Sequence, residues 1–391
     1  MQKYCNLNLG WRFKEGFKEE YITGGKDEEG RLVHVPHTVK EVPYDCFDQT
    51  MTCMISTYIR SFQLPDMAGK RALVSFEGVS ACYDLYINGH KAGSHKGAYS
   101  MALFDITEYV TQGGNRMVLC VDSHERSDVP PNGSTVDFLI YGGIYRDVTL
   151  YIQEETYVKQ VLFRYSLDHG TAVLEPELLI RSHGPERNLW AVTSLQKDGV
   201  LVWENRQKIQ VSPDTASISL KPGQVGPVGL WQPEDPQLYQ AGVELQDEDG
   251  RCVDCFQTRI GFRTIQVEPD GFYLNGKRTK LIGLNRHQSY PYAGYAMGRR
   301  AQEKDACLLK DFMGLNMVRC SHYMQSRYFL DKCDELGLMV FEEIPGWGYI
   351  GDEEFKKVVF QDLENMVLGH FNHPGIVIWG TRLNETTDYD E

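Results

Sequence analysis

The pattern of the chain changes near residue 266, from short strands joined by turns to strands that alternate with helices. Apolar runs predict strands and helical periodicity predicts helices beyond this point, in the order 280–287, 301–313, 316–320, 326–336, 338–344, 352–370 and 375–383. Gly314 and Gly337 stand where the first two helices should end, because glycine readily adopts a left-handed C-cap. Alternating strands and helices imply parallel strands, so an α/β domain is predicted for residues 266–391.

The chain before residue 266 has the pattern of β structure in two units. Residues 1–155 hold short runs of alternating apolar and polar residues, and Asn88-Gly89 is a strong hairpin signal. A jelly-roll β-sandwich fits this pattern. Closely spaced short strands across residues 156–265 favour an immunoglobulin-like β-sandwich. The sequence therefore predicts a multidomain protein of β plus α/β class.

The bulk properties of the chain argue against several kinds of partner. A formal net charge of −14 leaves no basic patch to neutralise phosphates, so nucleic acid is not expected as a partner. No apolar run is long enough for a transmembrane helix, and the N-terminus lacks the apolar core of a signal peptide. The ten cysteines show no framework of spacings, and Cys252-x-x-Cys255 lacks the second pair that a structural zinc site needs. A cytoplasmic protein without membrane, metal or cofactor is the simplest interpretation.

Polar and ionisable residues stand at the carboxyl ends of the four predicted parallel strands. They are Asn285-Arg286-His287, Arg319-Cys320-Ser321-His322, Glu342-Glu343 and Asn384-Glu385. In a (β/α)8 barrel the active site gathers at this face, where the loops after successive strands meet. The alternative explanation is that residues at strand ends are polar simply because the loops that follow them are exposed to water. Four such ends in succession, rich in His, Arg and Glu, nevertheless favour a functional site.

Glu385 is the strongest candidate for a catalytic group. It follows the apolar strand body 376–379, and a carboxyl at the rim beside Trp379 is suited to act first as a general acid and then as a base. Glu342 and Glu343 are weaker candidates, because adjacent residues of a strand point to opposite faces and only one of them can face a barrel interior. The alternative for Glu385 is a solvated loop carboxylate.

His287 and His322 follow neighbouring strands and are suited to bind substrate hydroxyls or a metal ion. Metal binding is the less favoured use, since the two residues lack HxxxH-type spacing. Asp137 lies in a glycine-bearing loop of the first predicted domain and by itself predicts only a turn.

Five stretches of the sequence, in order, resemble motifs of glycoside hydrolase family 2, which includes β-galactosidases and β-glucuronidases. They are the loop D-F-L-I-Y-G-G-I-Y-R-D-V at 137–148, G-L-N-R-H at 283–287, N-M-V-R-C-S-H-Y at 316–323, C-D-E-L-G-L-M-V-F-E-E at 333–343, and N-H-P-G-I-V-I-W at 372–379 followed by Asn384-Glu385. The resemblance extends along the whole chain. It implies a jelly-roll sugar-binding domain at 1–155, an immunoglobulin-like sandwich at 156–265 and the first half of a (β/α)8 TIM barrel at 266–391.

The resemblance also implies a retaining glycosidase and a role for each matching residue. Glu385 would be the acid/base, and Asn384 would lie near the 2-hydroxyl of the sugar. His287, His322 and Asp137 would contact the glycone, and Arg319 would support the nucleophile. In such enzymes the nucleophile is a second carboxylate about 5–5.5 Å from the first, which attacks the anomeric carbon.

The sequence departs from the family pattern in two ways. The family's nucleophilic Glu comes from a later barrel strand that this sequence lacks, so the chain is expected to be an N-terminal portion that is inactive alone. The stretch 344–349 lacks the E-T-H that helps to bind magnesium in some β-galactosidases, so no such metal site is predicted. Trp347 in this stretch is either a platform against a sugar face or a core residue.

The leading interpretation is a β-galactosidase-like hydrolase of terminal β-linked sugars that acts by double displacement. A β-glucuronidase is the nearest alternative in substrate. Two other classes remain open: a non-catalytic carbohydrate-binding protein and an assembly module, since members of the family often pair through their β domains into homo-oligomers.

Overall fold

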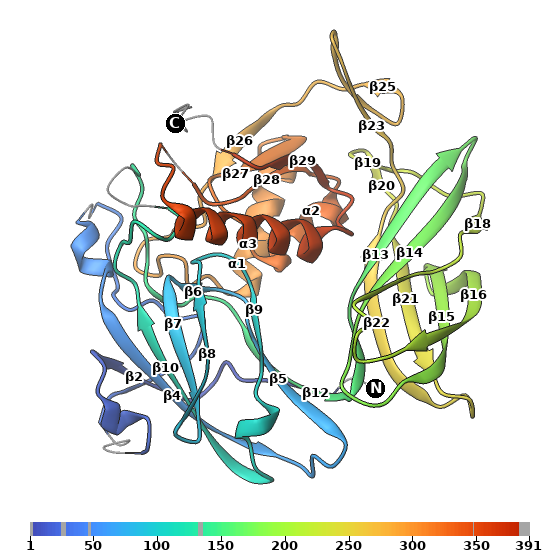
Figure 1. Cartoon of the computed structure of the whole chain (residues 1–391). Helices are drawn as coiled ribbons and strands as arrows, with labels where there is room; N and C mark the ends of the chain where they lie inside the picture. The colour runs from blue at the N-terminus through green and yellow to red at the C-terminus, as the bar shows by residue number, and fades with distance from the viewer. Residues whose placement is uncertain (1–2, 25–28, 46–47, 132–135, 347, 383–391) are drawn as a thin grey trace.

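The computed structural model of the chain describes residues 3–24, 29–45, 48–131, 136–346 and 348–382 (Figure 1). Two antiparallel β-sandwiches come first, and an α/β region follows them. Trp347, Asn384 and Glu385 lie outside the described residues. Within the described ranges, no helix has the length and apolar character needed to cross a membrane.

The first sandwich packs a four-stranded antiparallel sheet against a six-stranded one. In spatial order, the smaller sheet contains β1 (Lys3–Asn6), β12 (Val148–Glu154), β5 (Lys70–Phe76) and β9 (Ala102–Asp105). The larger sheet contains β3 (Arg31–Val33), β2 (Trp11–Glu15), β4 (Ile55–Leu64), β10 (Gly113–Asp122), β7 (Cys82–Ile87) and β8 (His90–Lys96). Between the sheets lies an apolar core that includes the fully buried Trp11, Tyr58 and Phe76. The predicted β-sandwich is confirmed.

Short elements complete the first sandwich. A two-stranded sheet pairs β6 (Val79–Ser80) with β11 (Gly143–Ile144), and the 3-10 turns are η1 (Glu19–Tyr21), η2 (Gln49–Thr52) and η3 (Thr107–Tyr109). Asn88 and Gly89 join β7 to β8 with φ values of 50° and 90°. A two-residue hairpin of this kind needs positive φ at both positions, which confirms the turn predicted from the sequence.

The second sandwich begins at Thr156, immediately after the first. One of its sheets contains β13 (Thr156–Asp168), β14 (Thr171–Ser182), β17 (Ser217–Ser219) and β18 (Gly223–Val225). The other contains β16 (Val200–Val211), β15 (Arg187–Lys197), β21 (Tyr239–Gln246) and β22 (Cys252–Ile260). β19 (Trp231–Gln232) and β20 (Asp235–Pro236) form a hairpin whose turn contains Pro233. These strands confirm the second predicted sandwich.

The α/β region contains the parallel sheet that the sequence predicted. After the antiparallel strands β23 (Ile265–Glu268), β24 (Gly271–Leu274) and β25 (Lys277–Arg278), the chain forms β26 (Gly283–Arg286), β27 (Met317–Cys320), β28 (Met339–Glu343) and β29 (Ile376–Gly380). The last four strands pair in parallel in that order. The helices are α1 (Arg299–Cys307), which continues into the π-helical turn η5 (Leu308–Phe312), α2 (Arg327–Leu336) and α3 (Glu353–His370).

Local sequence signals explain where α2 begins and ends. The Ser326 hydroxyl caps the first turn by accepting from the backbone N–H of Tyr328. Gly337 ends the helix in the left-handed conformation at φ 68°. A Cβ at this glycine would lie 2.5 Å from the carbonyl oxygen of Pro233, so close packing also requires glycine here. Each signal is local, which is why the sequence was sufficient to place this helix.

A cluster of tyrosines joins the first sandwich to the α/β region. Tyr99 and Tyr145 come from the sandwich, and Tyr295 and Tyr323 from the α/β region; all four are buried. The rings of Tyr99 and Tyr323 stack at a centroid distance of 4.2 Å and an interplanar angle of 2°. The hydroxyls of Tyr99 and Tyr295 lie 2.9 Å apart. Burial of four aromatic rings favours one fixed arrangement of the two parts.

Candidate active site

The carboxyl ends of the parallel strands bring the two candidate histidines together. Arg286, at the end of β26, is in register with Cys320, at the end of β27. His287 and His322 follow these two strand ends, and the centroids of their rings are 5.4 Å apart. The predicted proximity of the two residues is therefore confirmed, although their role is a separate question.

Glu343, at the end of β28, holds both His322 and Arg319. Its Oε1 lies 2.6 Å from Nδ1 of His322, and its Oε2 accepts from Nε of Arg319 at 3.0 Å. Glu343 is fully buried, and the side chain of His322 is 7% exposed. A buried carboxylate is tolerated when charge-assisted hydrogen bonds satisfy both of its oxygens, as they do here. The pair fixes the orientation of the His322 ring.

Glu342 points to the other face of β28. Its Oε2 lies 2.8 Å from Nδ1 of His370 on α3, and its Oε1 accepts from the backbone N–H of Gln325 at 3.2 Å. Glu342 therefore links α3 to the sheet, whereas Glu343 binds residues of the candidate site. The prediction that only one of these two acids faces the site is confirmed.

His287 is held in its neutral form. Its Nδ1 lies 3.3 Å from the hydroxyl of the buried Tyr323. Burial lowers the pKa of His287 to about 4, His322 adds to this effect, and Asp137 acts weakly in the opposite direction. An imidazole that stays neutral near pH 7 can donate or accept a hydrogen bond, which suits contact with a sugar hydroxyl.

A loop of the first sandwich forms one side of this site. Asp137 is exposed, and the ring of the adjacent Phe138 lies 5.0 Å from that of His287 and 6.1 Å from that of His322. Two hydrogen bonds anchor this loop. The carbonyl oxygen of Leu139 accepts from the Tyr295 hydroxyl at 3.1 Å, and the carbonyl oxygen of Ile140 accepts from the Thr52 hydroxyl at 2.6 Å. The structure thus places a residue from the N-terminal part of the chain beside the strand ends.

Sequence reasoning missed two members of this cluster. Phe138 follows Asp137 in the family-like loop, and this position is the signal in the sequence that points to it. Tyr323 lies within a family-like motif, which assigns it no role, yet it contacts His287 and stacks on Tyr99. Both contacts join residues far apart in the sequence, so periodicity and spacing could not reveal them.

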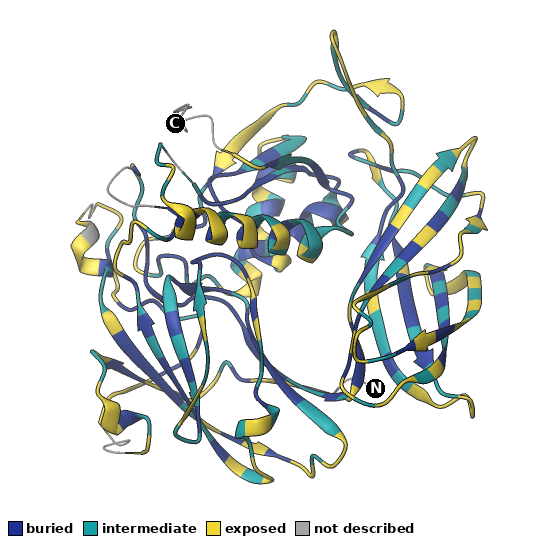
Figure 2. Cartoon of the chain, in the orientation of Figure 1, coloured by how far each residue is buried: buried dark blue, intermediate teal, exposed yellow. Residues whose placement is uncertain are grey.

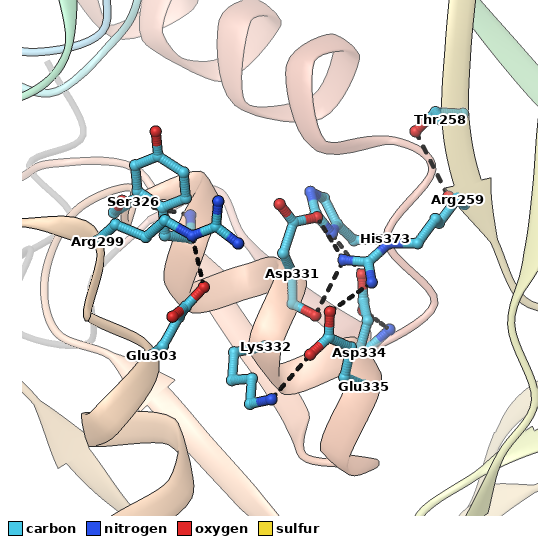
Figure 3. Close-up of polar contacts among 12 residues, drawn as sticks. Thr258, Arg259, Arg299, Glu303, Ser326, Asp331, Lys332, Asp334, Glu335 and His373 are labelled. Carbon is cyan, nitrogen blue, oxygen red and sulfur yellow. Dashed lines mark hydrogen bonds and ion pairs between the residues drawn. The ribbon is translucent and has the colours of Figure 1, made fainter. Parts of the chain in front are cut away.

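A second polar cluster lies at the opposite end of the parallel sheet, where α2 ends and β29 begins (Figure 3). Asp331, Asp334 and His373 bring their ligand atoms within 4.8 Å of one another, as metal ligands would. However, Nδ1 of His373 is already 2.6 Å from Oδ2 of Asp334, and Arg259 of β22 forms an ion pair with Asp331 at 3.0 Å. Burial alone would lower the pKa of His373, but Asp334 outweighs this effect and the pKa is raised. The cluster is therefore an ion-pair network between the second sandwich and the α/β region.

Models of one family match the chain in three consecutive segments. The sugar binding domain of glycosyl hydrolases family 2 matches residues 35–154, the next domain of the family matches residues 156–263, and its TIM barrel domain matches residues 265–389. The order and spacing are those expected from the five motifs in the sequence.

Related proteins support the same family. The chain is 40% identical to a β-galactosidase of Thermoanaerobacterium thermosulfurigenes, across 100% of this chain and 55% of the relative. It is 30% identical to a β-glucuronidase of Bacteroides fragilis, across 96% of this chain and 55% of the relative. A structure of Bacteroides uniformis β-glucuronidase 2, covalently bound to cyclophellitol-6-carboxylate aziridine, superimposes with a TM-score of 0.90 at 27% identity, over 97% of this chain and 47% of that one. The chain spans about half the length of the curated relatives it matches. It belongs to glycosyl hydrolase family 2.

Proposed function

We propose that the protein to which this chain belongs is a retaining β-glycoside hydrolase with a β-galactosidase-like substrate. The observation that carries the proposal is the cluster at the carboxyl ends of β26, β27 and β28. There His287 and His322 lie 5.4 Å apart, Glu343 orients His322, and Phe138 of the first sandwich adds an aromatic side. Hydrogen-bonding groups beside an aromatic ring are suited to recognise a sugar.

The proposed chemistry assigns Glu385 as the acid/base. It follows β29 in the sequence, as His287 and His322 follow β26 and β27. Its carboxyl would protonate the leaving oxygen and then, as carboxylate, activate the water that hydrolyses the glycosyl-enzyme. Asn384 would bind the 2-hydroxyl, and His287, His322 and Asp137 would bind the glycone. Trp347 is a second candidate for an aromatic platform.

The nucleophile would come from a strand that extends the parallel sheet. Ile282 and Leu284, at the β26 edge, are each 51% exposed, although such strands are normally buried on both faces. Four further strands and helices would cover them and complete a (β/α)8 barrel. Arg319, already paired with Glu343, would lie beside the nucleophile. The chain alone is therefore proposed to be inactive.

Two observations favour a galactoside over a glucuronide. Two β-galactosidases are 40% and 38% identical to this chain, whereas a putative β-glucuronidase and a β-glucuronidase are 33% and 30% identical. In addition, the glucuronide carboxylate calls for a cation. Within the described part of the site, His287 is neutral near pH 7 and Arg319 is paired with Glu343. A neutral glycone fits these groups better.

The test is an assay of the complete gene product on aryl β-galactosides and aryl β-glucuronides. We expect the galactoside to have the higher kcat/KM, and we expect Glu385→Gln to lower kcat about 10²–10⁴-fold, as for loss of a general acid. The loss should be smaller for leaving groups that need no protonation, and added azide should restore turnover and yield a β-glycosyl azide.

A folded Asp235→Asn variant, altered at an exposed position of the β19–β20 hairpin, is the control and should keep wild-type kcat. Absence of turnover on every β-glycoside would refute the proposal, and sugar binding without turnover would favour a non-catalytic carbohydrate-binding protein. We also propose a homo-oligomer formed through the β domains, which sedimentation of the chain would test. The cytoplasmic location stays a prediction.

A further inference from the structure

Helix α3 packs against the first sandwich through a polar contact. The proposed catalytic residues take no part in this contact. The helix passes close to the end of β8, where Gln361 contacts Lys96 (Figure 1), and its outer side is exposed to solvent (Figure 2). Nε2 of Gln361 donates to the carbonyl oxygen of Lys96 at 3.0 Å. The next residue, Asp362, is fully buried against the segment 95–100 of the sandwich.

Three polar groups converge on Gly97 in this contact. A Cβ built on Gly97 would lie 3.1 Å from Oδ1 of Asp362, 3.2 Å from Oγ of Ser100 and 3.4 Å from Nε2 of His95. The glycine has φ +127°, so a side chain there would be both strained and crowded. Oγ of Ser100 lies 3.4 Å from Nε2 of His95. The carboxyl group is therefore packed tightly, with hydrogen-bonding atoms close to it.

The charge state of Asp362 is the unusual feature of the contact. Neither of its oxygens has a partner in full hydrogen-bond geometry among the described residues, although the nearby Ser100 hydroxyl lowers its pKa in part. Burial of an unpaired carboxylate is strongly unfavourable, so a buried carboxyl group usually stays protonated. Burial raises the pKa of Asp362 to about 7, while burial of His95 lowers its pKa to about 4 and leaves it neutral. Tyr145 also interacts with Asp362, which adds to burial in raising the pKa of the tyrosine hydroxyl, and among the described residues Asp362 forms no ion pair.

We propose that Asp362 controls the contact between α3 and the segment 95–100, which we call the latch. The latch is closed when the carboxyl of Asp362 is protonated and is weakened when the carboxyl ionises. The acid form supplies an O–H that can donate to Oγ of Ser100 or Nε2 of His95, whereas the carboxylate has only acceptors. The latch is next to Tyr99, whose ring stacks on Tyr323, and Tyr323 contacts His287. Proton loss would therefore loosen the interface that supports the candidate site. This inference does not depend on the proposed catalytic activity.

The sign of the pH effect follows from the direction of the shift. An aspartate in the unfolded chain has a pKa of about 3.9, and folding raises it to about 7. The stability that the latch contributes is thus fully present below pH 4 and is lost as the pH rises through about 7. Above that range it adds nothing further to the pH dependence.

The experiment compares thermal unfolding of the wild-type chain with Asp362→Asn between pH 5 and pH 9. Asparagine keeps the shape of the protonated acid but cannot ionise. The Tm advantage of the variant over the wild type should be smallest near pH 5 and should grow by about 2–5 °C on going to pH 8.5, because the wild type loses the latch stability progressively between pH 4 and about pH 7. Other buried acids with a raised pKa, such as Glu77, are present in both proteins and cancel in the difference. The control Glu364→Gln, on an exposed position of α3, should show a pH-independent difference from the wild type.

Hydrogen exchange of the wild-type chain tests the latch without relying on a variant. Between pH 6 and pH 8 the protection factors of segment 95–100 should fall about tenfold, because the opening equilibrium gains this factor across a pKa near 7. Strands β13 and β14 of the second sandwich are the internal reference. A Tm difference for Asp362→Asn that is constant with pH would overturn the proposal. So would equal pH dependence of protection in segment 95–100 and in the reference strands.

Discussion

Nδ1 of His322, which follows β27, lies 2.6 Å from Oε1 of Glu343 at the end of the neighbouring parallel strand β28, and both side chains are buried. The contact means that a carboxylate from β28 sets the orientation of a candidate sugar-binding histidine that follows β27. The same carboxylate also binds Arg319. A single buried acid therefore organises two of the residues that the sequence singled out.

Replacement of this acid should destabilise the chain. Glu343→Gln removes the charge that Arg319 and His322 face, and loss of one partner from a buried ion pair typically costs 3–5 kcal/mol. Because Arg319 keeps 22% of its side chain exposed, we expect the smaller loss of roughly 2–3 kcal/mol in the free energy of unfolding. Urea unfolding measures it. Glu248→Gln, which disrupts an exposed pair with Lys208, should change stability by less than about 1 kcal/mol. Equal losses for both variants would contradict this account.

The pKa of His287 should lie below the ordinary histidine value, and the pKa of His373 should lie above it. Burial and His322 lower the pKa of His287 to about 4, so the stability it contributes is present above pH 6.5 and is lost as the pH falls toward 4. Asp334 raises the pKa of His373, so its contribution is present below pH 6.5 and is lost as the pH rises through the raised value. Imidazole chemical shifts followed by NMR against pH test both directions. A shared midpoint for the two rings would show that one assignment is wrong.

The stacked pair Tyr99 and Tyr323 should hold the first sandwich to the α/β region. Tyr99→Ala empties a fully buried ring position, and the expected loss is about 3–5 kcal/mol of unfolding free energy. Tyr99→Phe keeps the stack and removes only the contact with the Tyr295 hydroxyl, so about 1 kcal/mol is expected. Limited proteolysis would show whether the two parts separate in the alanine variant. If both variants lose the same amount, the hydroxyl contact dominates and the stacking argument fails.

The network around Arg259 should respond to salt rather than to metal ions. Arg259→Ala breaks its ion pairs with Asp331 and Glu335, which are partly exposed, so we expect a loss of about 1 kcal/mol that shrinks in high salt. Thermal unfolding in 0.05 M and 1 M salt measures this. Millimolar Zn²⁺ or Ca²⁺ should leave the wild-type Tm unchanged, because Arg259 and His373 already neutralise the acids. A rise of several degrees would instead identify a metal site.

The sequence was sufficient for features that depend on short-range physics. Period-two alternation predicted the strands of the first sandwich, closely spaced short strands predicted the second, and Asn88-Gly89 predicted a hairpin. Ser326 and Gly337 delimit α2 within a residue of the prediction. The strand and helix order implied a parallel sheet, which in turn placed His287 and His322 side by side. The roles of these residues, and of Glu385, Asn384, Asp137, Arg319 and Trp347, stay predictions.

Only the tertiary structure decided how distant segments combine. The sequence could not show that Phe138 lies against His287, that Glu343 rather than Glu342 serves the site, or that Asp362 is buried on Gly97. Each of these facts depends on which faces of separate elements meet, and burial then sets the charge state of the groups between them. Local propensity carries no information about such contacts, because the side chains that exclude water from one another are far apart in the chain.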